Sequence, residues 1–475
     1  ATSNGEKMKV PLIKGDSVDS SVDFRDALPV NMYGINKNIL GATGYMINFF
    51  GLSSFVTGEG VDRGAIWVSA ENLEGHYRVS GNSLLQITAT GIINNLGEIP
   101  GDTQVSMDYS FNNLAIVADG KLFYYNSTDG LREITDADVG SPIDVVWVDG
   151  YFFLTDGKDI YHSTLTNEEE FEPLDFSNAQ FMPDSSRGLG KNEDNEVLVF
   201  GEFTTEYFVN VGSDNFAFQR ISAKAQKIGL LGTHCKRELN GRWYSIARRK
   251  ETAPSFHIIS LGNEAIISTR ETDKVLATYT PDKLESATVD TMVIDNVKMV
   301  IFHLPDHTFL YNESVAETAG KEAAWSILKS DVLGNTKFRA KDPILDPRIG
   351  KWIIGDNQNS NIGYFNKDTF TQYEKLVEWT LYTPFIKLES LSVDMLEINT
   401  IPGIAIDGDA KVFISQTVDG RLYGNEWSQL YGDQHDYNQR FYIRALGYCR
   451  NWVGYKLRSA SRSRMAFTYL NIEAS

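Results

Sequence analysis

Short apolar runs separated by Asp-Gly pairs dominate the middle of the chain. Three such runs, at 144–148, 151–155 and 158–162, are separated only by Asp149-Gly150 and Asp156-Gly157. An Asp-Gly pair between strand-forming residues is a strong hairpin signal, because a type I′ turn requires a positive φ at both central residues. The pattern therefore predicts an up-down-up meander of very short antiparallel strands over this stretch.

The same plan recurs along most of the chain. Successive sets of two or three apolar runs begin at Ala65, Leu114, Asp144, Glu196, Trp243, Lys298 and Lys351. These starts are 49, 30, 52, 47, 55 and 53 residues apart. A period near 40–50 residues with several strands per unit is typical of a β-propeller. The last set has only two runs, 351–356 and 361–365, and we expect a strand from elsewhere in the chain to complete it.

Most of these runs are apolar at nearly every position rather than at alternate positions. Strands of this kind fit blades that are covered on both faces by neighbouring blades. The sequence therefore predicts an all-β chain with a β-propeller of six or seven blades over residues 61–372. A chain of β-sandwich domains, whose strands also recur at short intervals, is the alternative that the pattern leaves open.

Three stretches before residue 372 depart from the strand pattern. Residues 1–60 are rich in Gly, Asn, Asp and Ser, and we expect an extended N-terminal arm there. We also expect that removal of residues 1–45 leaves a soluble propeller that no longer assembles normally. Helical signals are weak: Thr166 with Glu169 fits a capping box, and Thr280-Pro281 could open a single turn.

Residues 373–475 have longer strands with stricter alternation. In this region Tyr455 and Leu457 are expected to point to one side of a strand, with Lys456 and Arg458 on the other. Such alternation is typical of an antiparallel sheet with one face in solvent. We therefore predict a separate C-terminal β-sandwich.

Composition narrows the class of protein. The net charge of −19 argues against a broad nucleic-acid-binding surface. No apolar run approaches the roughly 20 residues that cross a bilayer, residues 1–17 lack the apolar region of a signal peptide, and we expect no membrane anchoring. Cys235 and Cys449 are too few for a disulfide framework, which fits a protein made in a reducing cytoplasm.

Candidate catalytic chemistry is sparse. His303 and His307 have a spacing that could bind zinc on a helix, but Pro305 lies between them and strand-like runs flank them, so we expect a hairpin turn instead. His234 and Cys235 are adjacent, and adjacent strand positions point to opposite faces. No nucleophile-elbow, phosphate-loop or dinucleotide motif is present. We expect no cofactor, no metal and no enzymatic activity.

A carbohydrate-binding or glycoside-hydrolysing propeller is the alternative function. The chain has 63 acidic residues, so paired carboxylates for glycoside hydrolysis are available. Sialidase-type propellers carry repeated Ser-x-Asp-x-Gly-x-x-Trp boxes. The nearest approach here, between Ser415 and Tyr423, has a different spacing, occurs once and lies outside the predicted propeller.

One segment near the C-terminus carries charge of a single sign. Residues 437–472 contain no Asp or Glu. Their seven basic residues are Arg440, Arg444, Arg450, Lys456, Arg458, Arg462 and Arg464. We weigh three interpretations: a solvated sheet face, a docking face for an acidic partner such as a neighbouring subunit or an adaptor ring, and contact with DNA phosphates in a channel.

Several stretches, in a fixed order, also carry a family resemblance. They are 26–52, 176–190 with 200–212, QKIGLLGTHCK at 226–236, IFHLPDHTFLYN at 301–312, LYTPFIK at 381–387 and VGYKLR at 453–458. Together they resemble the tail hub proteins of short-tailed phages of enteric bacteria, also called packaged-DNA stabilisation proteins. The extreme N-terminus departs from that family.

The resemblance implies a non-enzymatic, propeller-bearing protein of the virion tail that is assembled in the host cytoplasm. In the family, a ring of six copies lies below the portal and its adaptor. The ring closes the DNA exit and anchors the tail needle and the receptor-binding tailspikes or fibres. We therefore expect partners of four kinds: further copies of this chain, the portal and adaptor, the needle and spikes, and double-stranded DNA held without sequence-specific binding.

Overall fold

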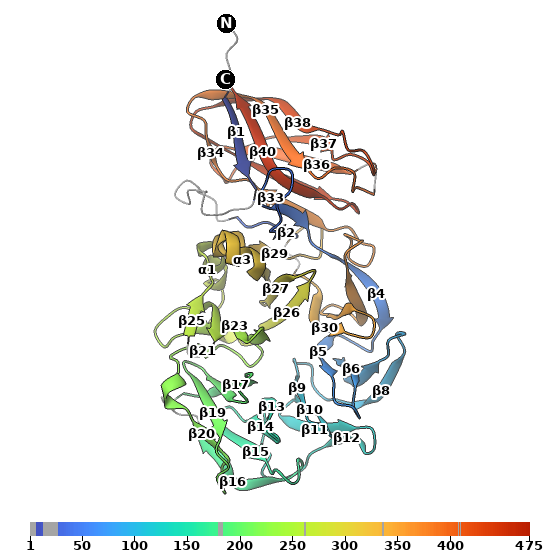
Figure 1. Ribbon diagram of the computed structural model, residues 1–475, viewed down its shortest axis with the longest axis vertical. Helices are drawn as coiled ribbons and strands as arrows, with labels where there is room; N and C mark the ends of the chain where they lie inside the picture. Colours follow the sequence, from blue (N-terminus) through green and yellow to red (C-terminus); the bar gives the residue numbers. More distant parts are fainter. Residues whose placement is uncertain are drawn as a thin grey trace.

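The chain folds into a β-propeller with a β-sandwich beside it (Figure 1). The computed structural model describes residues 6–12, 27–178, 184–260, 263–334, 337–406, 408 and 410–475. The sandwich packs next to α3 and β29 of the propeller, at the opposite end of the molecule from β13 to β16 (Figure 1). The predicted order of a propeller followed by a C-terminal sandwich is confirmed.

Seven blades form the propeller in the described part of the chain, which is the upper of the two predicted numbers. The strands of each blade are given from the inner to the outer strand. The first blade is β5 (Asp62–Val68), β6 (Gly75–Ser80), β7 (Ser83–Ile87) and β8 (Ile93–Glu98), and the second is β9 (Ser106–Tyr109), β10 (Leu114–Ala118), β11 (Lys121–Asn126) and β12 (Gly130–Glu133). The third blade is β13 (Asp144–Val148), β14 (Tyr151–Thr155), β15 (Asp159–Ser163) and β16 (Phe171–Asn178), and the fourth is β17 (Ser186–Lys191), β18 (Val197–Gly201), β19 (Thr205–Asn210) and β20 (Phe218–Arg220).

The fifth blade has five strands and the last two have four. In the fifth blade, β21 (Gly229–Leu230) and β22 (Lys236–Leu239) both pair with β23 (Arg242–Arg248), and β24 (Ser255–Ser260) and β25 (Asn263–Ile266) follow. The sixth blade is β26 (Thr288–Ile294), β27 (Val297–His303), β28 (Thr308–Asn312) and β29 (Trp325–Ile327). The seventh is β30 (Ala340–Asp346), β31 (Lys351–Asp356), β32 (Asn361–Asn366) and β4 (Gly51–Thr57).

Asp149-Gly150 makes the tight turn that the sequence predicts, and Asp119-Gly120 makes the same turn in the second blade. Asp149 and Gly150 have φ values of 51° and 92°, and Asp119 and Gly120 have 51° and 71°. Both central residues are therefore left-handed, as a type I′ turn requires. The tight turn expected at Asp156-Gly157 is wrong: only Gly157 has a positive φ there, and the loop is longer, because Thr155 pairs with Ile160. Strands β10 and β18 are buried at every position, which confirms that blades are covered on both faces.

The N-terminal region closes the ring of blades. Strand β4 pairs antiparallel with β32, from Asn361 opposite Thr57 to Asn366 opposite Gly51. The expected strand from elsewhere in the chain is therefore β4. Strands β1 (Glu6–Pro11), β2 (Met32–Ile35) and β3 (Tyr45–Asn48) are also in sheets. The described part of residues 1–60 therefore differs from the extended arm that we expected, while residues 1–5 and 13–26 lie outside the described residues. These strands pair with segments far away in sequence, so the local pattern does not show them.

The sequence missed most of the inner strands. Strands β9, β17, β22 and β30 read SMDY, SRGLGK, KREL and AKDPILD, whereas the predicted runs start one strand later in each blade. Inner strands face the polar centre of the ring, so Asp, Lys, Arg and Gly replace the apolar residues that mark a buried strand.

Helices are few in the described residues. They are α1 (Arg270–Leu276), α2 (Pro281–Leu284) and α3 (Glu313–Ala319), with 3₁₀ turns at Ser222–Lys224 and Lys321–Ala323. The turn expected after Thr280 is α2, with Pro281 at its first position. The capping box expected at Thr166 is wrong, because residues 164–170 form a turn in which Thr164 and Asn167 hydrogen-bond to each other. None of the helices in the described residues is long and apolar enough to span a membrane.

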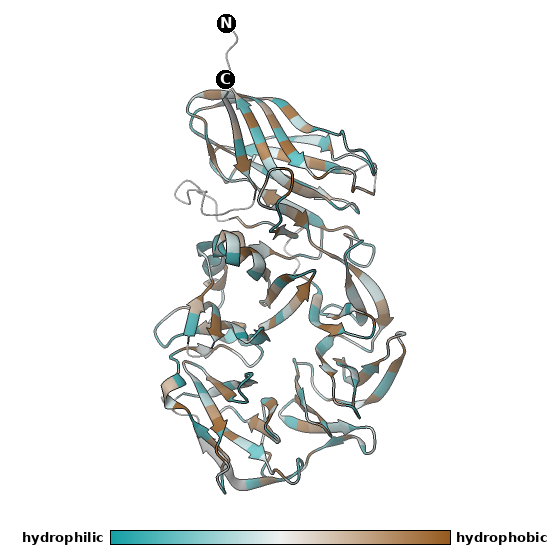
Figure 2. Ribbon diagram, in the orientation of Figure 1, coloured by the Kyte–Doolittle hydropathy of each residue, from teal (hydrophilic) through white to brown (hydrophobic). Residues whose placement is uncertain are grey.

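The sandwich has two sheets that enclose an apolar core. One sheet has the order β2-β3-β40-β35-β38 with β1 paired to β40, and the other has the order β33-β39-β36-β37 with β34 paired to β39. The strands not yet given are β33 (Glu378–Tyr382), β34 (Ile386–Lys387), β35 (Leu391–Thr400), β36 (Lys411–Thr417), β37 (Glu426–Leu430), β38 (Phe441–Cys449), β39 (Trp452–Ala460) and β40 (Ala466–Ala474). Bands of alternating hydropathy cross these strands (Figure 2).

The burial of β39 confirms the predicted alternation. Tyr455 and Leu457 are fully buried, whereas Lys456 and Arg458 are partly exposed. The two domains are joined by residues 29–31: the Val30 backbone pairs with Thr380 of the sandwich at 2.8 Å, and the Asn31 N–H donates to Ile327 of the sixth blade at 2.8 Å.

Candidate functional site

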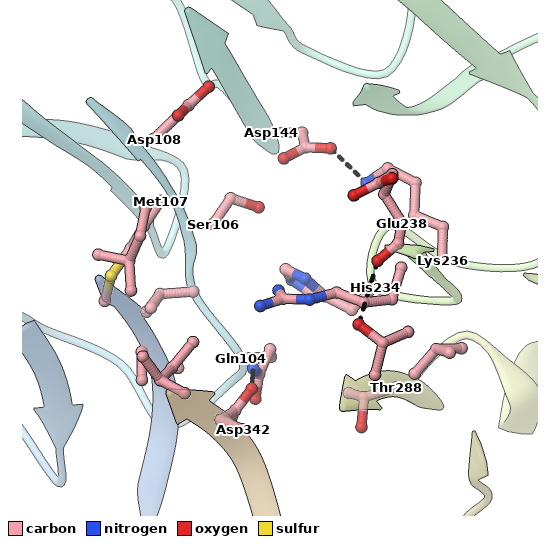
Figure 3. Close-up of a pocket in the computed structure, with 18 of the residues that line it drawn as sticks. Gln104, Ser106, Met107, Asp108, Asp144, His234, Lys236, Glu238, Thr288 and Asp342 are labelled. Atoms are coloured by element: carbon pink, nitrogen blue, oxygen red, sulfur yellow. Dashed lines mark hydrogen bonds and ion pairs between the residues drawn. The ribbon is translucent and has the colours of Figure 1, made fainter. Parts of the chain in front are cut away.

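The centre of the propeller is a cavity of about 530 Å³. Residues of every inner strand line it, and 12 of the 27 lining residues have polar or charged side chains (Figure 3). Among the labelled side chains, Asp108 and Asp144 approach from one side, and Lys236 and Glu238 from another (Figure 3). This is the place where a propeller would most readily hold a ligand, and the pairing of its charges determines what it could bind.

Aspartates on the inner strands bind the backbone of the following blade. The Asp108 carboxylate accepts a hydrogen bond from the Trp147 N–H at 2.7 Å, and Asp144 accepts one from the Leu189 N–H at 2.8 Å. Asp290 accepts one from the Asp342 N–H at 3.0 Å. Each aspartate therefore links its own blade to the next, which holds the inner strands in order around the ring.

Two of these carboxylates also reach the blade after next. Lys191 Nζ lies 2.6 Å from the Asp108 carboxylate, and Lys236 Nζ lies 2.8 Å from that of Asp144. A third bond of this reach starts from the seventh blade: the Asp342 carboxylate on β30 accepts a hydrogen bond at 2.7 Å from the amide of Gln104, just before β9 of the second blade. The Asp144–Lys236 pair is buried, whereas the Lys191 side chain is 43% exposed. Attraction within the buried pair offsets part of the cost of removing its charges from water. Carboxylates held in this way are already occupied, so they are poor candidates for general bases.

His234 and Cys235 lie on opposite sides of their segment, as expected. His234 extends into the cavity (Figure 3), and burial lowers its pKa to about 4. Cys235 is buried among apolar side chains and its thiol is placed to donate to the carbonyls of Leu284 and Ala287. Burial raises the pKa of the Cys235 thiol to about 12, so it is not a nucleophile near neutral pH.

The His303–His307 motif spans a hairpin turn, which confirms the interpretation from the sequence. His303 ends β27 and its Nε2 lies 2.8 Å from Asp290, whereas His307 Nδ1 lies 2.6 Å from the Tyr279 hydroxyl. The two imidazoles thus have different partners. Among the described residues, no group of three or more His, Cys, Asp or Glu side chains is placed to hold a metal ion.

The structure divides the seven predicted basic residues between the two sheets of the sandwich. Arg440 and Arg444 flank Tyr442 on β38 and its entry, and each guanidinium lies 5.3 Å from the centre of the Tyr442 ring. Arg450 follows the end of β38 and is exposed. Lys456 and Arg458 are on β39, in the other sheet, while Arg462 and Arg464 lie in the loop after it.

Acidic neighbours already pair with some of these cations. Arg458 forms two hydrogen bonds of 2.6 Å with the Glu426 carboxylate and one of 3.1 Å with Glu378. Arg440 bonds to Glu397 at 2.8 Å. The seven residues therefore do not form one basic face, and their role in docking stays a prediction.

Sequence reasoning missed the aspartates and lysines of the cavity. A usable signal was present, because an apolar residue directly precedes the aspartate at the start of three blades, in Met107-Asp108, Ile143-Asp144 and Val289-Asp290. The lysine partners have no comparable signal, since each lies two blades further along the chain.

Comparison with known proteins covers both domains. The family model described as "Bacteriophage P22 Gp10, beta-propeller" matches residues 8–370, and the model described as "Bacteriophage P22 Gp10, beta-sandwich" matches residues 378–475. The tail hub protein gp10 of Salmonella phage P22 is 28% identical over 474 residues, covering 96% of this chain and 97% of that protein.

Solved structures that resemble the chain do so at low identity. A streptogramin B lyase has a TM-score of 0.41 and 12% identity, covering 71% of this chain and 98% of its own. A catalytically inactive virginiamycin B lyase from Staphylococcus aureus has a TM-score of 0.44 and 10% identity, covering 66% and 98%. The WD40 domain of Neurospora crassa Pan2 has a TM-score of 0.41 and 7% identity, covering 67% and 97%.

The two family models together span nearly the whole chain and follow the two domains of the fold in order. The chain belongs to the bacteriophage P22 Gp10 family.

Proposed function

We propose that this protein is a structural tail hub of a short-tailed phage. The observation that carries the proposal is the match, over both domains, to the tail hub protein of Salmonella phage P22. A hub must offer several surfaces to different neighbours. A closed propeller supplies such surfaces through its loops, because its blades leave only short, protected sheet edges.

In the finer form of the proposal, six copies form a ring below the portal and its adaptor. The ring helps to retain packaged DNA and anchors the tail needle and the receptor-binding tailspikes or fibres. Assembly takes place in the host cytoplasm. DNA in the channel is held without sequence-specific binding, which fits a chain with a net charge of −19.

We further propose that the protein is not an enzyme. The cavity is the natural place for glycoside hydrolysis, which needs one carboxylic acid and one free carboxylate near the substrate. Asp108 and Asp144 are instead each bound to a lysine and to a backbone N–H. This pairing disfavours the alternative of a glycan-hydrolysing propeller.

Deletion of the gene from the phage that encodes it tests the proposal. We expect particles that package DNA but carry no needle or spikes and lose their DNA, and we expect the supplied protein to restore infectious particles. The protein should also be present in purified tails by immunoblotting. Complete, infectious particles without the protein would show that it is not the tail hub.

A further inference from the structure

Six loops of the propeller carry charge of a single sign. They connect the first to the second strand and the third to the fourth strand in the second, third and fourth blades, and we call them the acidic loops: 110–113, 127–129, 149–150, 164–170, 192–196 and 211–217. They contain no Lys or Arg. Their nine acidic residues are Asp129, Asp149, Glu168, Glu169, Glu170, Glu193, Asp194, Glu196 and Asp214.

The acidic loops lie on one face of the propeller. Successive strands of each blade are antiparallel, so the first and third connections of a blade are at the same end of its strands. The inner strands of all blades run in the same direction around the ring, which places these loops on a common face.

Contacts join the loops of neighbouring blades around the Asp149-Gly150 turn. Phe111 packs edge-on against Trp147, with ring centres 5.3 Å apart. The Asn210 amide donates to the Asp149 carboxylate at 2.7 Å, and the Leu165 side chain lies directly over Gly150. The loops therefore make one continuous surface rather than separate tips.

This surface also exposes large apolar side chains. Phe111 is 72% exposed, Leu165 is 63% exposed and Val211 is 52% exposed. Two of the nine carboxylates are already paired with cations beside the loops, Glu169 with Arg132 and Glu196 with Lys224. The others leave the surface mainly acidic, and an apolar patch with a polar rim is typical of a protein–protein contact. A partner that matches it needs basic residues together with apolar or aromatic groups.

The sandwich of the same chain has a surface of that kind, which we call the β38 surface. It consists of Arg440, Tyr442 and Arg444, with Tyr448 and Arg450 at the end of the strand. Strand β38 is the edge of its sheet, and Tyr448 is 62% exposed. It belongs to the segment 437–472, which has seven basic residues and no acidic one. Glu397 of the neighbouring strand β35 lies opposite Tyr442 and pairs with Arg440, so most of the charge for a contact comes from Arg444 and Arg450.

We propose that the acidic loops of one copy bind the β38 surface of a second copy. The two surfaces lie at opposite ends of the molecule (Figure 1), so they cannot meet within one chain. A contact between two different patches is heterologous, and such contacts close into rings when the rotation between copies allows it. The inference rests on the proposed function, because it names the contact that would join copies of the hub.

The charged side chains and the aromatic and apolar side chains have different roles in this contact. Complementary charges speed encounter and set register, and they weaken as salt rises. Aromatic side chains at the centre of an interface commonly supply much of the affinity. Phe111 with Leu165 on one side, and Tyr442 with Tyr448 on the other, are placed to do so.

Photo-crosslinking in assembled tails tests which partner the acidic loops meet. We would replace Phe111 with p-benzoylphenylalanine, irradiate purified particles and map the crosslinked peptides by mass spectrometry. We expect peptides from residues 437–472 of a second copy. The matched control places the same group at Leu333, which is 83% exposed on the other face, and should give no such peptide.

The outcomes separate the two proposals. Crosslinks from position 111 to a different virion protein, or only to other parts of this chain, would overturn the contact between copies while leaving the hub role in place. Absence of the protein from purified tails would overturn the hub role instead.

A charge exchange gives an independent test. Glu170→Lys with Asp214→Lys, or Arg444→Glu with Arg450→Glu, places like charges opposite each other and should lower the yield of tailed particles at least about tenfold. A chain that carries all four changes should recover most of the yield. Lys387→Glu with Lys411→Glu makes the same change on the other sheet, outside the seven basic residues, and should have little effect. Failure of the four-fold variant to recover, with normal melting curves, would overturn the proposal.

Discussion

The propeller and the sandwich use charged residues in opposite ways. In the propeller, Asp144 and Lys236 pair at the centre with only 5% and 8% of their side chains exposed. In the sandwich, the pair of Arg440 with Glu397 lies outside, with 57% of the arginine side chain exposed. The buried polar side chains among its described residues are Ser, Thr and Asn, and none of them is charged. The difference follows from geometry. Seven inner strands converge on one axis and need directional bonds to stay in order, whereas two sheets can pack by burial of apolar area alone.

The two domains also depend differently on the N-terminal region. The propeller takes one outer strand, β4, from it, while the sandwich takes β1, β2 and β3. Met32 and Val10 from these strands belong to the sandwich core. The N-terminal region is therefore a structural part of both domains, and a truncation there affects their folding as well as assembly.

The largest effect is expected from truncation. Removal of residues 1–45 takes away β1 and β2 but leaves β4, so we expect an unfolded or loosely packed sandwich beside a closed propeller. Removal of residues 1–57 also opens the seventh blade and should destabilise both domains. Limited proteolysis with mass spectrometry would follow each domain. Equal resistance of both domains in the shorter truncation would contradict the division of strands described here.

The next largest effect is expected at the central pairs. Asp144→Ala leaves the Lys236 ammonium buried without its partner, which should cost about 3–5 kcal/mol in the free energy of unfolding. Urea unfolding followed by tryptophan fluorescence would measure it. Asp144→Leu together with Lys236→Met is the control, because replacing both charges removes the unpaired ion. If the double variant loses as much stability as the single one, the loss does not come from leaving the Lys236 charge unpaired.

A moderate effect is expected from acid, and mainly in the propeller. Burial lowers the pKa of His234 and of His257 to about 4, below the value of about 6.5 for an unfolded chain. The unfolded state therefore binds more protons between these values, so stability is complete above pH 6.5 and is lost as the pH falls toward 4. The sandwich has only His435, which is exposed.

Hydrogen exchange at pH 7 and pH 5 would compare the domains. After division by the intrinsic exchange rate at each pH, we expect lower protection of the propeller amides at pH 5 than at pH 7, and a smaller change in the sandwich. His257→Gln removes one of the titrating groups and should reduce the pH dependence of the propeller. Equal acid sensitivity in both domains would contradict the assignment to buried histidines.

The smallest effect is expected at the surface pair. Arg440→Ala removes an exposed bond to Glu397, and exposed pairs contribute little because water and salt screen them. The urea midpoint of the variant should match that of the wild type within experimental scatter, at both low and high salt. A clear loss of stability would mean that the sandwich relies on charge pairs as the propeller does.

The sequence by itself determined the class of fold and most of its strands. Asp149-Gly150 and Asp119-Gly120 encode their turns locally, because Asp and Gly tolerate the positive φ that a type I′ turn requires. The same pair at Asp156-Gly157 lies in a longer loop, so the dipeptide favours the turn without deciding it. The continuous apolar runs revealed the middle strands of the blades, since burial on both faces leaves a continuous pattern. Strict alternation in residues 373–475 revealed the sandwich in the same way.

Only the tertiary structure decided the ring closure, the polar centre and the division of the basic residues. Strand β4 pairs with β32 more than 300 residues away, and no local pattern encodes a partner at that distance. Lys191 and Lys236 look like surface lysines until the ring brings them to Asp108 and Asp144. Arg444 and Lys456 are close in the sequence but lie on different sheets, because which sheet a strand joins is set by its pairing partners rather than by its own residues.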